Sequence, residues 1–252
     1  MSGHSKWHNI QARKSAVDKK KGKLFSKLIR EITIAAREGG GDPETNPRLR
    51  TAIEKAKEAN MPSENIKKAI LRGTGQLEGQ KYEEIVYEGY GPGGVAVYVE
   101  AVTDNKNRTT AEIRRIFSKH GGSLGENGCV SWMFERKGQL KIDPQGMSDD
   151  DILLISADAG AEDLKREDSE VYVYTSPSDL YKVKQSLEEN GIKVVSADFV
   201  MIPKNSVKVE GEKAEQTLKL ISELEDHDDI QKVFSNFEIS DEEMERIALS
   251  MK

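Results

Sequence analysis

Between residues 23 and 76 the apolar positions recur every three or four residues, which is the spacing of one helix face. The glycine-rich run at 39–43 ends the first helical stretch, because glycine accepts a left-handed cap. Asn46–Pro47 starts the second as an N-cap followed by proline at the first helical position. Pro62 opens the third and Gly73 ends it. Three short amphipathic helices with brief connections predict a small helical bundle.

The pattern changes to strands after residue 80. Alternating apolar residues predict strands at 82–88 and 95–102, followed by a helix at 106–120. Residues 139–202 show a strand–helix–strand–strand–helix–strand order, which fits a ferredoxin-like unit. A helix at 212–225 and a strand at 231–237 come next. Ser240 with Glu243 forms a capping box, which predicts a last short helix.

The first strand pair and helix are too few to close a sheet before residue 130, so we expect the segment after residue 204 to complete it. The predicted fold class is α+β: an N-terminal three-helix bundle followed by two ferredoxin-like α/β domains, the last inserted into the middle one. The predicted division is a basic mobile arm at 1–22, a helical bundle at 23–76, a middle domain at 80–130 plus 204–240, an inserted domain at 131–203 and a C-terminal helix at 241–252.

Charge is distributed unevenly along the chain. Residues 1–76 contain 17 Lys and Arg against 8 Asp and Glu, a net charge of +9. The whole chain of 252 residues carries −6, so the remainder carries −15. Such a split predicts that the N-terminal part binds a polyanion, and nucleic acid is the expected one.

The candidate nucleic-acid contacts are cations of the arm, the first helix and the second helix, one arginine further on, and Trp7. The cations are Lys6, Arg13, Lys14, Lys19, Lys20, Lys21, Lys23, Lys27, Arg30, Arg48, Arg50 and Arg108. Phosphate contacts of this kind give affinity without reading sequence. Two interpretations of Trp7 stay open: it stacks on an unpaired base, or it is a hydrophobic plug that docks the arm on the bundle. Arg108 is included because capping does not explain it.

Several chemical motifs are better explained by local structure. Gly89, Gly91 and Gly94 fit a dinucleotide fingerprint, but a strand follows them where a helix is required, so we predict a hairpin turn. The G-x-S-x-G run at 121–125 follows a helix and not a strand, unlike a hydrolase nucleophile. His4 and His8 lack a third metal ligand at suitable spacing. We therefore expect no enzyme activity, no cofactor and no metal.

Two further features indicate the cellular compartment. Cys129 is the single cysteine, which suits a reducing cytoplasm. No apolar run approaches the ~20 residues of a membrane span, so we expect no membrane partner. The acidic stretch at 223–229 is either a solvated loop and helix end or a surface that meets a basic one.

Longer motifs carry a family resemblance. GHSKWHNI, KGKLFSKLIREITIAAREGGGDPETNPRLRTAIEKAKEANMP, YEGYGPGG, TDNKNRT and GCVSWMFERKG lie in order over residues 2–138. Together they resemble the YebC/PmpR family. The resemblance implies a helical N-terminal domain followed by two α/β domains. It also implies a regulator, because members are described as DNA-binding transcriptional regulators, while some bacterial and mitochondrial relatives act as translation factors at the ribosome.

The predicted function is a nucleic-acid-binding regulator of gene expression, namely a DNA-binding transcriptional regulator that acts through its basic arm and first helix. The alternative is a ribosome-associated translation factor that binds ribosomal RNA. The residues leave both open, because phosphate binding looks the same in both. They also leave the oligomeric state open.

Overall fold

The computed structural model describes Trp7, residues 17–167 and residues 170–250. The chain forms two compact units, one of residues Phe134–Lys204 and one made from the sequence on both sides of it. The helices are α2 (Val17–Gly39), α3 (Pro47–Glu58), α4 (Ser63–Gly73), α5 (Lys106–Lys119), α6 (Asp149–Ala157), α7 (Leu180–Glu189), α8 (Gly211–Glu225) and α9 (Asp241–Ser250). Within the described ranges, none of them is both long and apolar enough to cross a bilayer.

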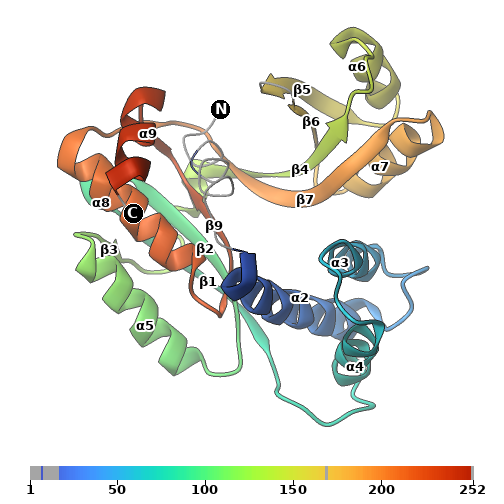
Figure 1. The fold of residues 1–252 in the computed structure, drawn as a ribbon, viewed down its shortest axis with the longest axis horizontal. Coiled ribbons are helices and arrows are strands. Elements are labelled where there is room, and N and C mark those ends of the chain that lie inside the picture. The colour runs from blue at the N-terminus through green and yellow to red at the C-terminus, as the bar shows by residue number, and fades with distance from the viewer. Residues whose placement is uncertain (1–6, 8–16, 168–169, 251–252) are drawn as a thin grey trace. The chain divides into compact units, whose positions relative to one another are not determined.

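The strands come after the first three helices and lie between the remaining ones along the chain (Figure 1). They are β1 (Glu83–Tyr90), β2 (Ala96–Thr103), β3 (Ser123–Leu124), β4 (Phe134–Asp143), β5 (Ala161–Glu167), β6 (Glu170–Thr175), β7 (Lys193–Pro203), β8 (Val207–Lys208), β9 (Ile230–Ser235) and β10 (Phe237–Glu238). Short 3-10 turns lie at Pro92–Gly94 and Ser131–Met133. The predicted α+β fold is confirmed, including the insertion of one domain into another.

Helices α2, α3 and α4 form the predicted bundle around a core of aliphatic side chains that includes Ile32, Leu49 and Ile66. Asn46 caps α3, since its Oδ1 accepts the Leu49 N–H at 3.0 Å. The same side chain donates from Nδ2 to the carbonyls of Ala35 and Gly40, both at 2.8 Å. The Asn46 side chain thereby forms hydrogen bonds with both the end of α2 and the start of α3.

The predicted boundary of the basic arm is wrong. Helix α2 begins at Val17, six residues before the expected start at Lys23, so residues 17–22 are helical. The lysines at 19–21 are good helix formers, and Gly22 costs only about 1 kcal/mol inside a helix. The tertiary packing of the rest of α2 stabilises the longer helix. Apart from Trp7, the arm at residues 1–16 lies outside the described residues.

Gly73 ends α4, as predicted, but its main role is close packing. A Cβ atom at this position would lie 2.8 Å from the Cβ of Ala36 and closer still to the carbonyl oxygen of Thr33. Both partners belong to α2. Glycine therefore lets α4 approach the backbone of α2, which a larger residue would prevent.

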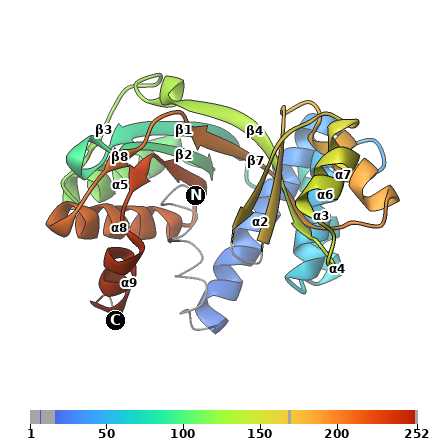
Figure 2. The same ribbon diagram turned by 90° about the horizontal axis from the view of Figure 1, so that it is seen from above.

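The middle domain has a four-stranded antiparallel sheet in the order β3-β1-β2-β9. Helices α5 and α8 cover one face of it (Figure 2). The Gly89–Gly94 motif spans the end of β1 and the hairpin turn to β2: Gly89 pairs with Val97, and Gly93 and Gly94 lie in the turn at φ 74° and 81°. Because β9 pairs with β2, the segment after the inserted domain completes this sheet, as the sequence predicts.

The C-terminal segment packs into the same domain. Met244 and Ile247 of α9 are buried in the core formed by α5, α8 and the sheet, so α9 is part of the middle domain and not a separate element. The predicted strand at 231–237 is split, since β10 leaves β9 and pairs in parallel with β8. The predicted capping box is half formed: Ser240 Oγ accepts the Glu243 N–H at 3.4 Å, whereas the Glu243 carboxylate accepts the Gly211 N–H at 2.7 Å.

The inserted domain has a four-stranded antiparallel sheet in the order β5-β6-β4-β7. With α6 after β4 and α7 after β6, this is the predicted ferredoxin-like arrangement. Strand β4 begins before residue 139, where the predicted unit starts, because it pairs with β7 from Phe134↔Pro203 to Asp143↔Lys193. Pairing partners far along the chain stabilise the polar stretch that begins β4, which has no apolar alternation of its own.

Candidate nucleic-acid interface

The basic edge of α2 lies against the C-terminal end of α8. Lys23 Nζ donates to the carbonyl oxygen of Asp226, and Lys27 Nζ donates to that of Glu225, both at 2.8 Å. The last carbonyls of a helix have no partner within the helix and carry its partial negative charge. Two lysines of α2 therefore supply hydrogen bonds to the carbonyl groups at the end of α8.

The loop after α8 adds carboxylates to this contact. We call residues 225–229 (Glu-Asp-His-Asp-Asp) the acidic segment. Arg30 donates to the carbonyl oxygen of Asp228, and its Nη2 lies 3.0 Å from the Asp229 carboxylate. The Arg30 guanidinium also covers the ring of Tyr82, with 5.6 Å between the guanidinium carbon and the ring centroid. The acidic stretch thus meets a basic surface of its own chain, which is the second of the two interpretations left open by the sequence.

Asp229 is the centre of the contact. Its side chain is buried and accepts hydrogen bonds from Thr109 Oγ1 at 2.7 Å and Arg108 Nη2 at 2.8 Å. Burial alone would raise the pKa of this carboxyl, but the hydrogen bonds from Thr109 and Arg108 and the charges of Arg30 and Arg108 lower it below its ordinary value. Asp229 is therefore a carboxylate held between arginines of α2 and α5.

Lys27 shows the opposite balance. Burial lowers the pKa of its amine, and the nearby charges of Glu225 and Asp226 only partly restore it. The α2 edge is consequently a partly buried surface whose cations already have anionic partners.

A polar groove of about 530 Å³ follows this contact. Four cationic side chains line it, together with acidic residues and His227: the cations are Lys23, Arg30, Arg108 and Arg115. Within it, Glu112, His227 and Asp229 have ligand-type atoms within 4.8 Å of one another. His227 is already bonded, however, to Glu112 at 2.8 Å and to the Asp229 N–H at 3.1 Å. This group is satisfied as a hydrogen-bond network.

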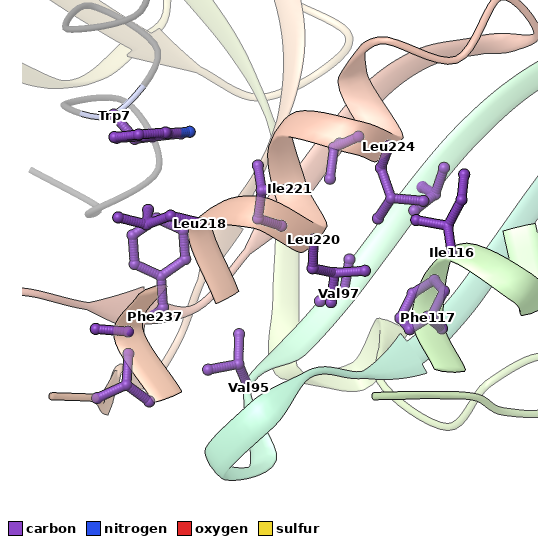
Figure 3. Packing of buried hydrophobic residues seen from close by; sticks show 14 of the residues in the cluster. Trp7, Val95, Val97, Ile116, Phe117, Leu218, Leu220, Ile221, Leu224 and Phe237 are labelled. Carbon is purple, nitrogen blue, oxygen red and sulfur yellow. The ribbon is translucent and has the colours of Figure 1, made fainter. Parts of the chain in front are cut away.

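Trp7 is not available for stacking on a base. Its side chain is 1% exposed and belongs to the core of the middle domain, and its Nε1 donates to Ser222 Oγ of α8 at 3.2 Å (Figure 3). A buried indole beside Leu218 and Phe237 is a hydrophobic plug, which is the second of the two interpretations. The plug docks on the middle domain, however, and not on the helical bundle as expected.

Two arginines of α3 are used inside the protein. Arg48 binds three carboxylates, of Glu31 at 2.9 Å, Glu38 at 2.7 Å and Glu84 at 2.6 Å. Burial opposes the charged form, but the bonds to Glu31 and Glu84 outweigh it and raise the pKa of Arg48. Arg50 donates to the carbonyls of Pro43 at 3.0 Å and Glu44 at 3.1 Å. Arg48 thus joins α3 to α2 and to β1, and Arg50 holds the connection between α2 and α3.

The remaining predicted contacts lie near the chain start. Lys21 is exposed on α2, with its amine 5.7 Å from the ring centroid of Phe25. Lys19 and Lys20 stand on the first turns of the same helix. Three predicted contacts, Lys6, Arg13 and Lys14, lie outside the described residues.

Glu88 is a charged residue outside the predicted site residues. It is 4% exposed and accepts backbone N–H groups from Gly128 and Val130 at 2.8 Å and from Ser131 at 2.7 Å. Burial would raise its pKa, but these three bonds lower it. Glu88 holds the loop that leads to β4. A glutamate next to a glycine in a strand gives no sequence signal for this role, because the loop follows about 40 positions later.

The comparisons with known proteins agree with the fold. Residues 5–76 match the N-terminal domain of TACO1/YebC proteins, and residues 82–237 match their second and third domains. The chain belongs to the TACO1/YebC family. A probable transcriptional regulatory protein of Dictyoglomus turgidum is 60% identical over 98% of this chain and 100% of the relative. One from Thermotoga maritima is 57% identical over 98% of each chain.

A solved structure supports the same family. The crystal structure of a conserved hypothetical protein from Aquifex aeolicus is 51% identical, covers 90% of this chain and 94% of its own, and has a TM-score of 0.83. Family membership confirms the resemblance found in the sequence motifs. The names of the curated relatives support a regulator at the level of the family.

Proposed function

We propose that the protein is a DNA-binding regulator of transcription that holds the DNA backbone with its basic N-terminal part. The observation that carries this proposal is the charge of +9 in residues 1–76 against −15 in the remainder. A cationic end on an acidic body attracts a polyanion to one site and repels it elsewhere. The names of the curated relatives support a role in transcription.

The contacts of α2 refine which cations bind DNA. Lys23, Lys27 and Arg30 are bonded to the acidic segment, so they anchor the helix and are not free for phosphates. We assign the phosphate contacts to the cations that precede them: Lys6, Arg13, Lys14, Lys19, Lys20 and Lys21. Such contacts give affinity with little sequence selectivity, so selectivity has to come from DNA shape or from a partner protein.

The proposal includes that the protein acts by binding DNA without catalysing a reaction, and that it acts in the cytoplasm. Its support is the sequence: the glycine motifs lack the element order of nucleotide-binding or hydrolase sites, and the single cysteine suits a reducing compartment.

Ultraviolet crosslinking in growing cells tests the proposal, when the DNA and RNA recovered with the protein are sequenced separately. We expect discrete promoter fragments, which disappear when Lys19, Lys20 and Lys21 are replaced by Ala. Recovery of ribosomal RNA without promoter DNA would overturn the proposal in favour of a translation factor. Unchanged promoter crosslinks in the triple variant would overturn the assigned lysines.

A second measurement defines the DNA-binding lysines in vitro. Removing one phosphate contact to duplex DNA lowers the slope of log affinity against log salt by roughly 0.9. If all three lysines bind phosphates, the slope of the triple variant falls by about 2.7 by the same rule. A slope equal to that of the wild type contradicts the proposed role of these residues.

A further inference from the structure

Helix α5 is a cationic element within the acidic part of the chain. Its 14 residues, Lys106–Lys119, contain five Lys and Arg and one acidic residue, Glu112. The remainder after residue 76, to which α5 belongs, has a net charge of −15. The positive charge of α5 does not serve the core of the domain. The residues that α5 buries there are uncharged: Thr109, Ile113, Ile116 and Phe117.

One face of α5 points away from the core of the middle domain and is exposed. Asn107, Ala111, Arg114 and Ser118 are exposed and follow one stripe of the helix, and Arg115 is exposed beside it. The small side chains leave the backbone of the helix open to close approach. Asn107 and Ser118 add neutral hydrogen-bond donors of the kind that contact phosphate oxygens.

The two arginines on this face differ from many cations of the acidic part in having no carboxylate partner. Elsewhere Lys and Arg are paired with acids of their own domain: Lys137 with Glu162, Lys141 with Glu170, Arg166 with Asp149, Lys208 with Glu210 and Lys219 with Glu215. Among the described residues, neither Arg114 nor Arg115 makes an ion pair or a hydrogen bond through its side chain. Two adjacent unpaired arginines repel each other, and an external anion removes that repulsion.

The face also continues the α2 surface. Arg115 lines the polar groove together with Lys23, Arg30 and Arg108. Arg108 and Arg30 bind the same carboxylate, that of Asp229, which fixes α2 next to the start of α5. A polyanion held at the N-terminal part of α2 can therefore reach the exposed Arg115 of α5 across this groove, in which the carboxylate of Asp229 is already bound by Arg30 and Arg108.

We propose that the outer face of α5 is a second contact for the DNA backbone, with Arg114 and Arg115 binding phosphates. This inference rests on the proposed function, because it takes DNA as the polyanion. It adds a binding surface outside the basic N-terminal part. The N-terminal part and the middle domain then hold the same duplex, which explains why α2 is anchored to the acidic segment at a fixed place.

Fluorescence anisotropy with a short labelled duplex DNA tests this second surface over a salt series. The full-length wild type is compared with Arg114→Ala/Arg115→Ala. We expect the log–log salt slope to fall by about 1.8, which is two contacts at roughly 0.9 each. Arg114→Lys/Arg115→Lys keeps both charges and is expected to keep the slope.

The matched control is Lys208→Ala/Lys219→Ala, which removes two positive charges that are already paired with Glu210 and Glu215. It changes the net charge by the same amount, and we expect an unchanged slope. An equal fall of the slope in this control would mean that net charge alone acts, which overturns the inference. Thermal melting of each variant confirms that the exposed substitutions leave the fold intact.

The arm variant Lys19→Ala/Lys20→Ala/Lys21→Ala separates the two proposals. If the arm variant loses salt slope but Arg114→Ala/Arg115→Ala binds duplex DNA with the slope of the wild type, only the α5 surface is overturned. A wild type that fails to bind duplex DNA overturns the proposed function and the α5 contact with it.

Discussion

The Arg30 guanidinium lies 3.0 Å from the Asp229 carboxylate and joins α2 to the loop before β9. The side chains of this pair are 15% and 4% exposed, so most of the contact is withdrawn from water. The apolar cores of the helical bundle and the middle domain are separate clusters. The junction between them is therefore largely polar, and its stability depends on how well its charges are matched.

Replacing Asp229 by Asn is expected to lower the free energy of unfolding by about 3 kcal/mol, because it leaves Arg30 buried without its partner. Urea unfolding of the wild type, Arg30→Ala, Asp229→Asn and the double variant measures the coupling between the two. We expect a coupling energy of about 1–3 kcal/mol. Additive effects would mean that Arg30 and Asp229 act independently.

The pH dependence of the same pair follows from the lowered pKa of Asp229. A carboxyl with a lowered pKa in the folded state stabilises that state above its unfolded pKa of about 3.9, and this contribution is lost as the pH falls through the folded value. The difference in stability between wild type and Asp229→Asn should be constant from neutral pH to about pH 5 and shrink below about pH 4. A difference that persists unchanged into strong acid would contradict the ionised state of Asp229.

Glu88 is expected to tolerate even an isosteric change poorly. Glu88→Gln keeps the size of the side chain but removes its charge, and only one of its two terminal atoms accepts hydrogen bonds. Three backbone N–H groups of the 128–131 loop then compete for one oxygen. We expect a loss of about 2–3 kcal/mol in unfolding free energy.

Hydrogen exchange localises the effect of Glu88→Gln. The N–H groups of Gly128, Val130 and Ser131 are expected to exchange faster, while those of the helical bundle do not change. Glu83→Gln is the matched control, since Glu83 lies exposed on the same strand. Protection of the loop equal to that of the wild type would show that Glu88 does not hold it.

Trp7 provides a direct optical test of its role as a plug. The chain has two tryptophans, so Trp132→Phe leaves Trp7 as the single fluorophore. Because Trp7 is buried against α8, saturating duplex DNA is expected to leave its emission unchanged, while denaturant shifts it to the red. Strong quenching by DNA or single-stranded nucleic acid would indicate stacking on a base instead. Trp7→Ala is expected to lose about 3–5 kcal/mol of stability.

Local signals in the sequence predict most of the fold. Asn46–Pro47 starts α3 and Asn105 caps α5, because capping needs only neighbouring residues. The ferredoxin-like unit follows from strand and helix order. The expected start of this unit at residue 139 is too late, because the first half of β4 is stabilised by β7, about 60 residues later.

The candidate site depends on distant contacts and is harder to predict. The basic residues are evident from the sequence, but their partners are not. Trp7 and Ser222 are separated by 215 positions, and Lys27 and Glu225 by 198. Charge counts alone cannot separate cations that anchor α2 from cations that are free for phosphates. The excess of arginine and lysine on α5 is present in the sequence, yet only the structure shows which face of the helix is exposed.

Asn46 has two roles: the predicted N-cap of α3 and the unpredicted hydrogen bonds to the end of α2. Two substitutions separate these roles. Asn46→Asp keeps an N-cap oxygen for the Leu49 N–H but removes the Nδ2 donor to Ala35 and Gly40. Asn46→Ala removes both functions. Because the side chain is 4% exposed, we expect losses of about 1–3 kcal/mol for each buried carbonyl group left without a partner. Asn46→Asp should therefore be nearly as damaging as Asn46→Ala in urea unfolding. A stability of Asn46→Asp close to that of the wild type would mean that only the cap matters, and that the bonds to the end of α2 contribute little.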